Sequence, residues 1–162
     1  MNQQTNYNGK EMSCIDIVLP NYNKAIFLEE CINSIFNQTY KNWNLFIIDD
    51  KSNDHSRTII KKYLKKNVFV IYLKKNKGVS FCRNLAIRFS KSKYISFIDA
   101  DDYWSHNKLE EQISFMEEYN HGFTYSDYTP FTTKNNKKKF KKQIIVPNSF
   151  DYHQFIKNTS IG

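Results

Sequence analysis

Glycine and proline are scarce in this sequence, with four Gly and three Pro among 162 residues. This scarcity excludes a collagen-like chain and a glycine-rich linker. Long hydrophobic runs are also missing, since a stretch such as 68–73 falls far short of the ~20 apolar residues of a membrane-spanning helix. Hydrophobic residues still make up 40% of the chain and charged residues 25%. The composition therefore indicates a folded globular protein, and the length indicates one domain.

Cysteine is also rare and widely spaced. Cys14, Cys31 and Cys82 form no C-x-x-C pair, which argues against a disulfide framework and against a zinc site. Each lies in or beside an apolar stretch, so we expect buried free thiols. Residues 1–13 are polar and contain no apolar segment typical of a signal peptide. We expect them to form a flexible arm, and we expect a cytoplasmic protein.

Positive charge is concentrated in one segment. The net charge is +8, and six of the lysines lie between Lys134 and Lys142; without those six the net charge is +2. A nucleic-acid-binding protein usually spreads basic residues over a groove or a helix face, so no nucleic-acid partner is expected. The simplest interpretation is a solvated loop or hairpin edge. Peripheral contact with an anionic membrane surface, or with an acidic acceptor, remains open.

Short apolar stretches alternate with segments whose apolar residues recur at helical spacing. This pattern predicts strands at 15–19, 45–48, 68–73 and 94–98, and helices at 25–37, 56–66, 79–89 and 106–119. An alternation of this kind indicates an α/β fold with a mostly parallel sheet and helices on both faces. The pattern is weaker after Tyr119. It suggests a strand at 122–126, extended segments around a lysine-rich turn at 127–146, and a last helix capped by Ser149 or Asp151.

A polar cluster follows each predicted strand. The four clusters are 20–23, 49–52, 76–78 and 99–102. In parallel α/β sheets, ligands bind beyond the carboxyl ends of the strands. The four loops therefore predict one binding site along a single edge of the sheet.

The acidic triplet Asp99, Asp101 and Asp102 is the sharpest of these features. Crowded carboxylates raise one another's pKa unless a cation or hydrogen-bond donors compensate. Mg²⁺ and Mn²⁺ prefer oxygen ligands and commonly take one or two carboxylates together with substrate phosphates. The alternative is a solvated acidic turn that caps the helix beginning at His106. The position on the same edge as a second acidic pair favours the metal interpretation.

Four other side chains on this edge suit a nucleotide. The pair Asp49 and Asp50 could accept hydrogen bonds from a nucleobase or a ribose, or could simply precede a helix cap. Tyr22 offers a flat face for base stacking, against ordinary packing as the alternative. Arg83 could meet a diphosphate, although a solvated helical arginine is equally plausible on sequence alone.

Several other chemistries lack their signatures. No G-x-G-x-x-G follows the first predicted strand, and no G-x-x-x-x-G-K-[ST] occurs, which removes the fingerprints of dinucleotide and P-loop sites. No G-x-S-x-G nucleophile elbow is present. The four histidines show no spacing typical of metal ligands.

Five segments, taken in order, resemble the motifs of family 2 glycosyltransferases with the Rossmann-like GT-A fold. They are residues 17–23 (IVLPNYN), 34–40 (SIFNQTY), 47–52 (IIDDKS), 76–80 (NKGVS) together with 83–84 (RN), and 97–102 (FIDADD). The resemblance covers about residues 15–130. Each motif alone is weak, whereas all five in order are specific.

The resemblance implies an inverting, metal-dependent glycosyltransferase of hexosyltransferase type, which uses a nucleoside diphosphate sugar, usually a UDP-sugar, with Mn²⁺ or Mg²⁺. The Asp-x-Asp pair, Asp99 and Asp101, would hold the metal and the donor. Asp50 is similar to the residue that hydrogen-bonds the base. The full set of implied donor-binding residues is Pro20, Tyr22, Asn23, Asp49, Asp50, Arg83, Asp99, Ala100 and Asp101. The acceptor would be a saccharide or a lipid-linked sugar in polysaccharide or glycoconjugate synthesis.

The catalytic base of the family lies in an acidic motif beyond the matched region, and no such motif follows Asp127. We therefore expect residues 14–162 to form a single donor-binding domain that is truncated, with the base beyond Gly162. Asp102 and Asp127 are poor substitutes for it. Two other functions remain open: a nucleotide-binding module without catalysis, and a basic adaptor for lipid or nucleic acid that uses Lys134–Lys142.

Overall fold

The computed structural model describes residues 13–134 and 137–147. Its contacts divide the chain into two compact units, Met1–Glu110 and Glu111–Gly162. The predicted arm at 1–13 and the predicted helix beginning near Ser149 lie almost entirely outside the described residues.

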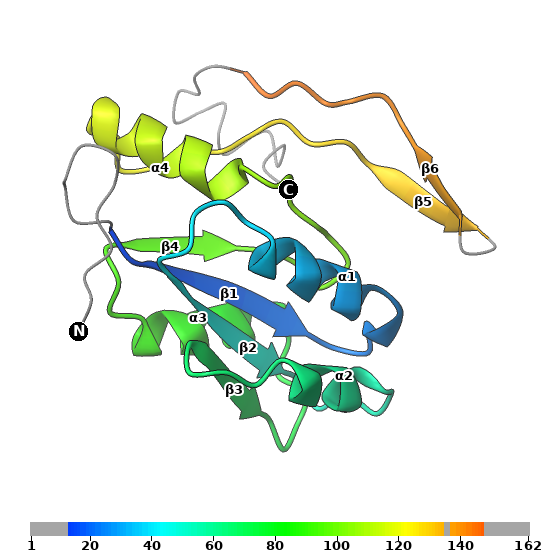
Figure 1. Cartoon of the computed structure of the whole chain (residues 1–162). Helices are drawn as coiled ribbons and strands as arrows, with labels where there is room; N and C mark the ends of the chain where they lie inside the picture. Colours follow the sequence, from blue (N-terminus) through cyan, green and yellow to red (C-terminus); the bar gives the residue numbers. More distant parts are fainter. Residues whose placement is uncertain (1–12, 135–136, 148–162) are drawn as a thin grey trace. The chain divides into compact units, whose positions relative to one another are not determined.

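The first unit is built on a four-stranded parallel sheet (Figure 1). Its order is β3-β2-β1-β4, and neighbouring strands pair in parallel throughout. The strands are β1 (Ile15–Asn21), β2 (Trp43–Asp49), β3 (Val68–Tyr72) and β4 (Tyr94–Phe97). The predicted parallel α/β architecture is confirmed.

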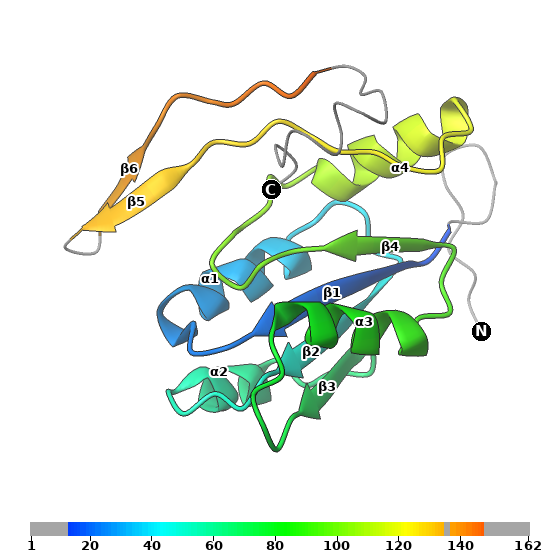
Figure 2. The same cartoon turned by 180° about the vertical axis from the view of Figure 1, so that it is seen from behind.

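Helices lie on both faces of this sheet. They are α1 (Ala25–Phe36), α2 (Ser56–Lys62) and α3 (Val79–Phe89). The first two connections step from β1 to β2 to β3, so right-handed crossovers place α1 and α2 on one face. The third connection steps back across the sheet to β4, which places α3 on the opposite face, the near one in Figure 2.

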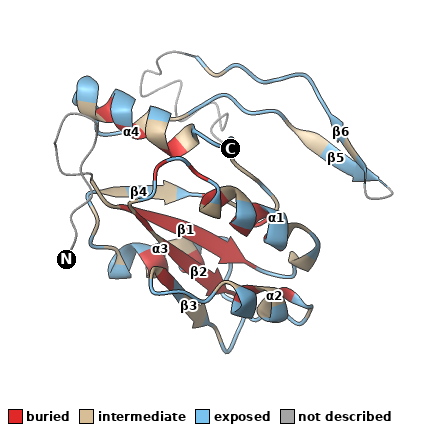
Figure 3. Cartoon of the chain, viewed as in Figure 1, coloured by how far each residue is buried: buried red, intermediate tan, exposed pale blue. Residues whose placement is uncertain are grey.

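The core of the unit lies on either side of β1 and β2, whose residues are almost all buried (Figure 3). Side chains alternate along a strand, so each strand supplies both faces. Val18, Phe46 and Ile48 pack with Cys82 and Ala86 of α3. Cys31 and Cys82 are buried free thiols as expected, whereas Cys14, just before β1, is only half-buried.

Several predicted element boundaries differ from the structure, most of them by one or two residues, and two of the differences have a physical explanation. The strand predicted to end before Pro20 continues to Asn21. The last pair between β1 and β4 is Val18–Phe97, so at Pro20 the strand has a neighbour only on the β2 side. Proline is tolerated at such an edge position, where its missing N–H breaks no ladder hydrogen bond. The helix predicted to reach residue 66 ends at Lys62. It stops early because Leu64, the last apolar residue of its stripe, remains 55% exposed and has no core to join.

The order of the strands creates a switch point. The chain runs from β1 outward to β3 and then returns to place β4 on the other side of β1. Beyond Val18 and Phe97, β1 continues without a partner on the β4 side. A crevice at the carboxyl ends of two such strands is the usual ligand site of an open α/β sheet.

The second unit contains a hairpin of β5 (Phe131–Lys134) and β6 (Lys137–Phe140), which pair antiparallel. The division falls within α4 (Lys108–Glu118). The predicted extended segments around a lysine-rich turn are confirmed for the described residues. The predicted strand at 122–126 is wrong: these residues form no ladder, and a single bridge joins Tyr128 to Ile144 instead. Within the described ranges, none of the helices has the length and apolarity needed to cross a membrane.

Candidate functional site

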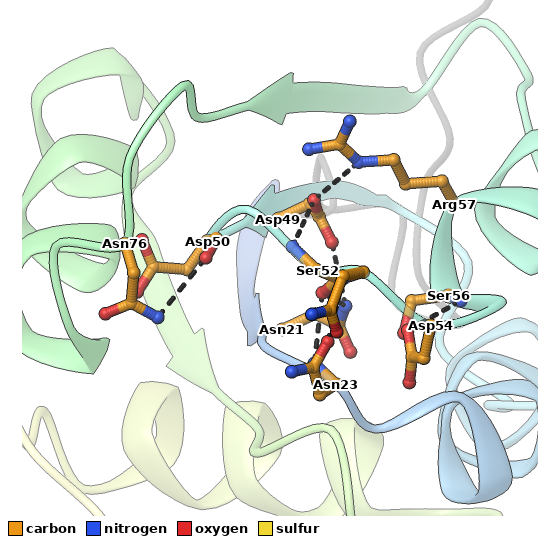
Figure 4. A network of polar contacts seen from close by, with 10 residues as sticks. Asn21, Asn23, Asp49, Asp50, Ser52, Asp54, Ser56, Arg57 and Asn76 are labelled. Carbon is orange, nitrogen blue, oxygen red and sulfur yellow. Dashed lines mark hydrogen bonds and ion pairs between the residues drawn. The ribbon is translucent and has the colours of Figure 1, made fainter.

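A buried polar network joins the carboxyl ends of β1 and β2 (Figure 4). The Asn21 amide Nδ2 donates to Asp49 Oδ2 and to Ser52 Oγ, both at 3.0 Å. Ser52 N in turn donates to Asp49 Oδ1 at 3.2 Å. Asp49 is completely buried, and its one salt bridge comes from Arg57 Nε at 2.9 Å. Asp49 therefore fixes the geometry of the loop after β2.

Asp50 holds the loop before α3. Its two carboxylate oxygens accept hydrogen bonds from the backbone N–H groups of Lys77, at 2.7 Å, and Gly78, at 2.8 Å. Asn76 Nδ2 donates to the Asp50 carbonyl at 3.3 Å. Asp50 is only 3% exposed. The predicted base-binding residue thus also shapes the loop that leads to Arg83.

The loop after β1 presents Tyr22, which is 47% exposed. Asn23 adopts a positive φ of 52°, a conformation that asparagine tolerates well. Its backbone N–H donates to Ser52 Oγ at 3.0 Å, and its Oδ1 accepts from Asn53 N at 2.9 Å. These contacts tie the loop after β1 to the loop after β2 and leave the Tyr22 side chain in solvent.

The acidic loop after β4 carries two salt bridges. Arg83 of α3 contacts Asp99 at 2.6 Å, and Lys24 contacts Asp101, also at 2.6 Å. All four side chains are between 37% and 44% exposed. Ala100, between the two acids, is buried and anchors the loop. The structure thus pairs Arg83 with Asp99 and Lys24 with Asp101 on one loop.

Three carboxylates lie close together in the acidic loop. Partial burial, followed by the charges of Asp101 and Asp99, raises the pKa of Asp102. Burial and the same three carboxylates also raise the pKa of the Cys31 thiol, whose Sγ lies 3.5 Å from the Asp99 carbonyl oxygen. A cation placed at this loop would relieve the repulsion between the carboxylates.

The two aspartates fit a divalent cation that is shared with a ligand. One oxygen of each is engaged by Arg83 or Lys24, and the other oxygen accepts no hydrogen bond from the part of the chain that is described. No three His, Cys, Asp or Glu side chains of residues 13–134 and 137–147 converge as a complete metal cage. Mg²⁺ and Mn²⁺ commonly use one or two carboxylates and complete their shells with phosphate oxygens and water.

The sequence interpretation missed several contributors. Lys24, Asn21 and Arg57 were not singled out, although Asn21 and Lys24 flank the residues that were. Asp54 also connects the loops after β1 and β2. Its carboxylate accepts hydrogen bonds from the backbone N–H groups of Ala25 and Ser56, each at 2.9 Å. The sequence indicates these residues only through the many polar side chains at 20–24 and 49–57. It does not show which of those side chains contact one another.

Asp127, considered as a substitute base, has a structural contact instead. Its Oδ1 accepts a hydrogen bond from Val146 N at 2.8 Å within the second unit. Asp102 belongs to the acidic loop beside Asp101. The described residues therefore supply an anion-rich edge with two flanking cations, an arrangement suited to a cation and a diphosphate together.

Comparison with known proteins identifies the family. The model of glycosyl transferase family 2 matches residues 16–161. TuaG of Bacillus subtilis (strain 168), whose name links it to teichuronic acid biosynthesis, is 33% identical over 150 residues, which are 91% of this chain and 59% of TuaG. The Escherichia coli β-1,3-glucosyltransferase WfgD, named for UDP-Glc and α-D-GlcNAc-diphosphoundecaprenol, is 32% identical over 148 residues, 91% of this chain and 57% of WfgD.

Among solved structures, residues 1–349 of Staphylococcus aureus TarS in complex with UDP superpose with a TM-score of 0.63 at 28% identity. The match covers 67% of this chain and 33% of that one. TarS has also been solved with UDP-GlcNAc. The chain thus spans less than two thirds of the length of each of these relatives. The family model covers most of the chain, and the parallel sheet and the order of the motifs agree with it. The chain therefore belongs to glycosyltransferase family 2.

Proposed function

We propose that this chain is the donor-binding part of an inverting glycosyltransferase that uses a UDP-sugar and a divalent cation. The observation that carries the proposal is the acidic loop after β4, at the switch point between β1 and β4, where Asp99 pairs with Arg83 and Asp101 pairs with Lys24. The likeness to TarS, solved with UDP and with UDP-GlcNAc, supports the choice of donor.

The first two loops are proposed to receive the nucleoside. Tyr22 is exposed and would stack on the base. Asp50 would accept a hydrogen bond from the base through a remaining lone pair, since each carboxylate oxygen can accept more than one bond. Pro20, Asn23 and Asp49 would shape the pocket wall through the contacts between the loops after β1 and β2.

Asp99 and Asp101 would hold Mn²⁺ or Mg²⁺. When bound, such an ion offsets the charge that develops on the departing diphosphate. Arg83, fixed on α3, would contact the same diphosphate, because a guanidinium matches phosphate oxygens in two-point contacts. Ala100 would keep the two aspartates at the right spacing by its burial.

The acceptor is proposed to be a saccharide or a lipid-linked sugar in the cytoplasm, at the inner face of a membrane. The name of WfgD, which includes a diphosphoundecaprenol-linked sugar, supports this acceptor class. The catalytic base is proposed to lie outside this chain, because Asp127 already accepts a backbone hydrogen bond and the family's acidic motif does not occur here. The base would deprotonate the acceptor hydroxyl.

The test is calorimetric titration of UDP into the protein with Mn²⁺, with Mg²⁺ or with EDTA, paired with thermal unfolding. UDP should raise the unfolding temperature, and more so with the metal, because a ligand of the native state stabilises it by mass action. Asp101→Asn should weaken Mn²⁺-dependent UDP binding roughly tenfold or more. Asp127→Asn, the control in the second unit, should leave it unchanged. If no nucleoside diphosphate binds under any of these conditions, the proposal is wrong.

A nucleotide-binding module without catalysis is the second candidate, favoured by the lack of a recognisable base motif after Asp127. It binds UDP and Mn²⁺ in the same way. Release of UDP from a UDP-sugar in the presence of saccharide acceptors separates the two. Turnover by this chain excludes the second candidate, whereas tight binding with no turnover favours it.

A further inference from the structure

Lys24 occupies an unusual position for a lysine. It is the residue that precedes α1, and its carbonyl oxygen accepts hydrogen bonds from the N–H groups of Phe27 and Leu28, each at 2.9 Å. The amino-terminal end of a helix carries partial positive charge, so an acidic residue is favoured there and a lysine is not. Helix stability therefore does not account for Lys24. Its ammonium lies 2.6 Å from Asp101 Oδ2.

We propose that Lys24 is a displaceable counterion of Asp101, which occupies that carboxylate in the donor-free protein and leaves it when the divalent cation and the diphosphate bind. This inference rests on the proposed function. It adds a specific residue that makes metal binding dependent on donor binding.

The charges of the site support this coupling. Asp99 and Asp101 are each paired with one cation, Arg83 and Lys24, so the four side chains together are neutral. Asp102, in the same loop, adds one negative charge, so a divalent cation entering alone would leave a net positive charge. A diphosphate entering with the cation removes that excess. Metal and diphosphate should therefore bind more tightly together than separately.

Lys24 is better suited than Arg83 to move. The Lys24 backbone is fixed by the first turn of α1, whereas its flexible four-carbon side chain carries the charge as a single point. The two ion pairs are similarly exposed, at 42% and 41% for Lys24–Asp101 and 37% and 44% for Arg83–Asp99, and exposed ion pairs are weak, so exposure does not distinguish them. Arg83 is anchored on α3, and its Nε is buried and unpaired among the described residues. The released ammonium of Lys24 would then contact the diphosphate.

The experiment compares Mn²⁺ binding to the wild-type chain and to Lys24→Met, with and without UDP, by calorimetry or by electron paramagnetic resonance of free Mn²⁺. Without UDP, Lys24→Met should bind Mn²⁺ about two- to fivefold more tightly, because no ammonium competes for Asp101. In the presence of Mn²⁺, the same variant should bind UDP more weakly. The enhancement of Mn²⁺ affinity by UDP should therefore shrink.

Two control variants separate direct pairing from a general change of charge. Lys61→Met removes a positive charge from the exposed last turn of α2, and Lys62→Met removes one from a surface pair with Glu29. Both should leave the UDP enhancement at the wild-type value. Lys24→Arg keeps the charge and should retain most of the enhancement. Thermal unfolding checks that each variant is folded, and Lys24→Gln replaces Lys24→Met if the latter is not.

The outcomes are distinct. If the wild-type chain binds no UDP with Mn²⁺, the proposed function itself fails. If the wild-type chain binds both ligands but Lys24→Met behaves like Lys61→Met, Lys24 is not the counterion and this inference fails. Tighter Mn²⁺ binding by Lys24→Met alone, with a reduced UDP enhancement, supports it.

Discussion

Asp16 of β1 is a buried carboxylate outside the candidate site. It is 2% exposed and accepts a hydrogen bond from the Asn44 amide at 2.8 Å. The segment after α3 supplies four more donors: the hydroxyls of Ser90 and Ser92, both at 2.7 Å, and the backbone N–H groups of Lys91 and Ser92. Burial alone would raise its pKa, but the hydrogen bonds together hold the pKa below the usual value. A single side chain thus joins β2 and the segment after α3 to β1.

Asp16→Ala should lower the free energy of unfolding by about 3 kcal/mol, because it leaves several buried donors without an acceptor. Urea unfolding followed by circular dichroism measures the change. Glu29→Ala is the control, since Glu29 forms only an exposed pair with Lys62 at 3.3 Å and should cost less than about 1 kcal/mol. Equal losses in the two variants would contradict the structural role of Asp16.

The same carboxylate should make stability depend on pH. The pKa of Asp16 is lower in the folded than in the unfolded chain. Its contribution to the free energy of unfolding is therefore complete at a pH above the unfolded-state pKa, and it is lost as the pH falls through the folded-state pKa. We expect the wild-type chain to lose more stability than Asp16→Asn between about pH 5 and pH 2. Urea unfolding of both proteins at several pH values measures this. Parallel curves would show that Asp16 does not contribute.

At the scale of elements, the loop between β3 and α3 depends on Gly78. Gly78 has φ of 86°, and a Cβ added there would meet no atom within 4 Å. The restriction is therefore one of backbone conformation and not of space. The Gly78 N–H also donates to Asp50, so the conformation of this residue connects the acidic pair after β2 to the start of the helix that carries Arg83.

Gly78→Ala should destabilise the protein by about 1–3 kcal/mol, because φ of 86° with ψ of 160° is a conformation that residues with a Cβ rarely adopt. It should also weaken UDP binding, because the loop and Arg83 shift together. Gly122→Ala is the matched control: it has open space and no positive φ, and should change neither quantity appreciably. Urea unfolding and UDP titration measure both effects. A fully stable Gly78→Ala variant would contradict the backbone argument.

At the scale of the whole molecule, the positive charge is uneven. The described lysines of the hairpin are exposed or half-buried, and Lys134 lies directly opposite Lys137 in the ladder. Like charges facing each other across two strands destabilise them. Beside them, Phe140 is 54% and Ile145 77% exposed. Lysines together with exposed apolar groups suit an anionic lipid surface, in line with the proposed lipid-linked acceptor.

Replacing Lys137, Lys138 and Lys139 by Ser should weaken binding to vesicles that contain phosphatidylglycerol roughly tenfold or more, because each lysine near an anionic surface contributes about 1 kcal/mol. Co-sedimentation at several salt concentrations measures the binding. Replacement of Lys61, Lys62 and Lys65 removes the same charge from the first unit and should have a smaller effect. If the two triple variants bind alike, only the net charge matters and the hairpin is not a specific contact.

The parallel α/β fold, the helix at 79–89 and the position of the acidic loop were all predictable from the sequence. They depend on periodicity and on residue order, which are local properties of the chain. The strand predicted at 122–126 failed because its apolar pattern is not satisfied by a neighbouring strand. The helix beginning at Ser56 is shorter than predicted because Leu64 continues the apolar helical pattern but stays exposed. Whether an apolar side chain is buried depends on the distant segments that pack against it, and the local pattern does not contain that information.

The sequence by itself determined which residues are acidic, where they stand relative to apolar strands, and hence that they gather at one edge of a sheet. Only the tertiary structure decided their partners: Asp50 with the backbone of Lys77 and Gly78, and Asp101 with a lysine 77 positions away. The physical reason is that strand and helix patterns are set by near neighbours, whereas ion pairs and buried hydrogen bonds depend on which distant segments the packed sheet brings into contact.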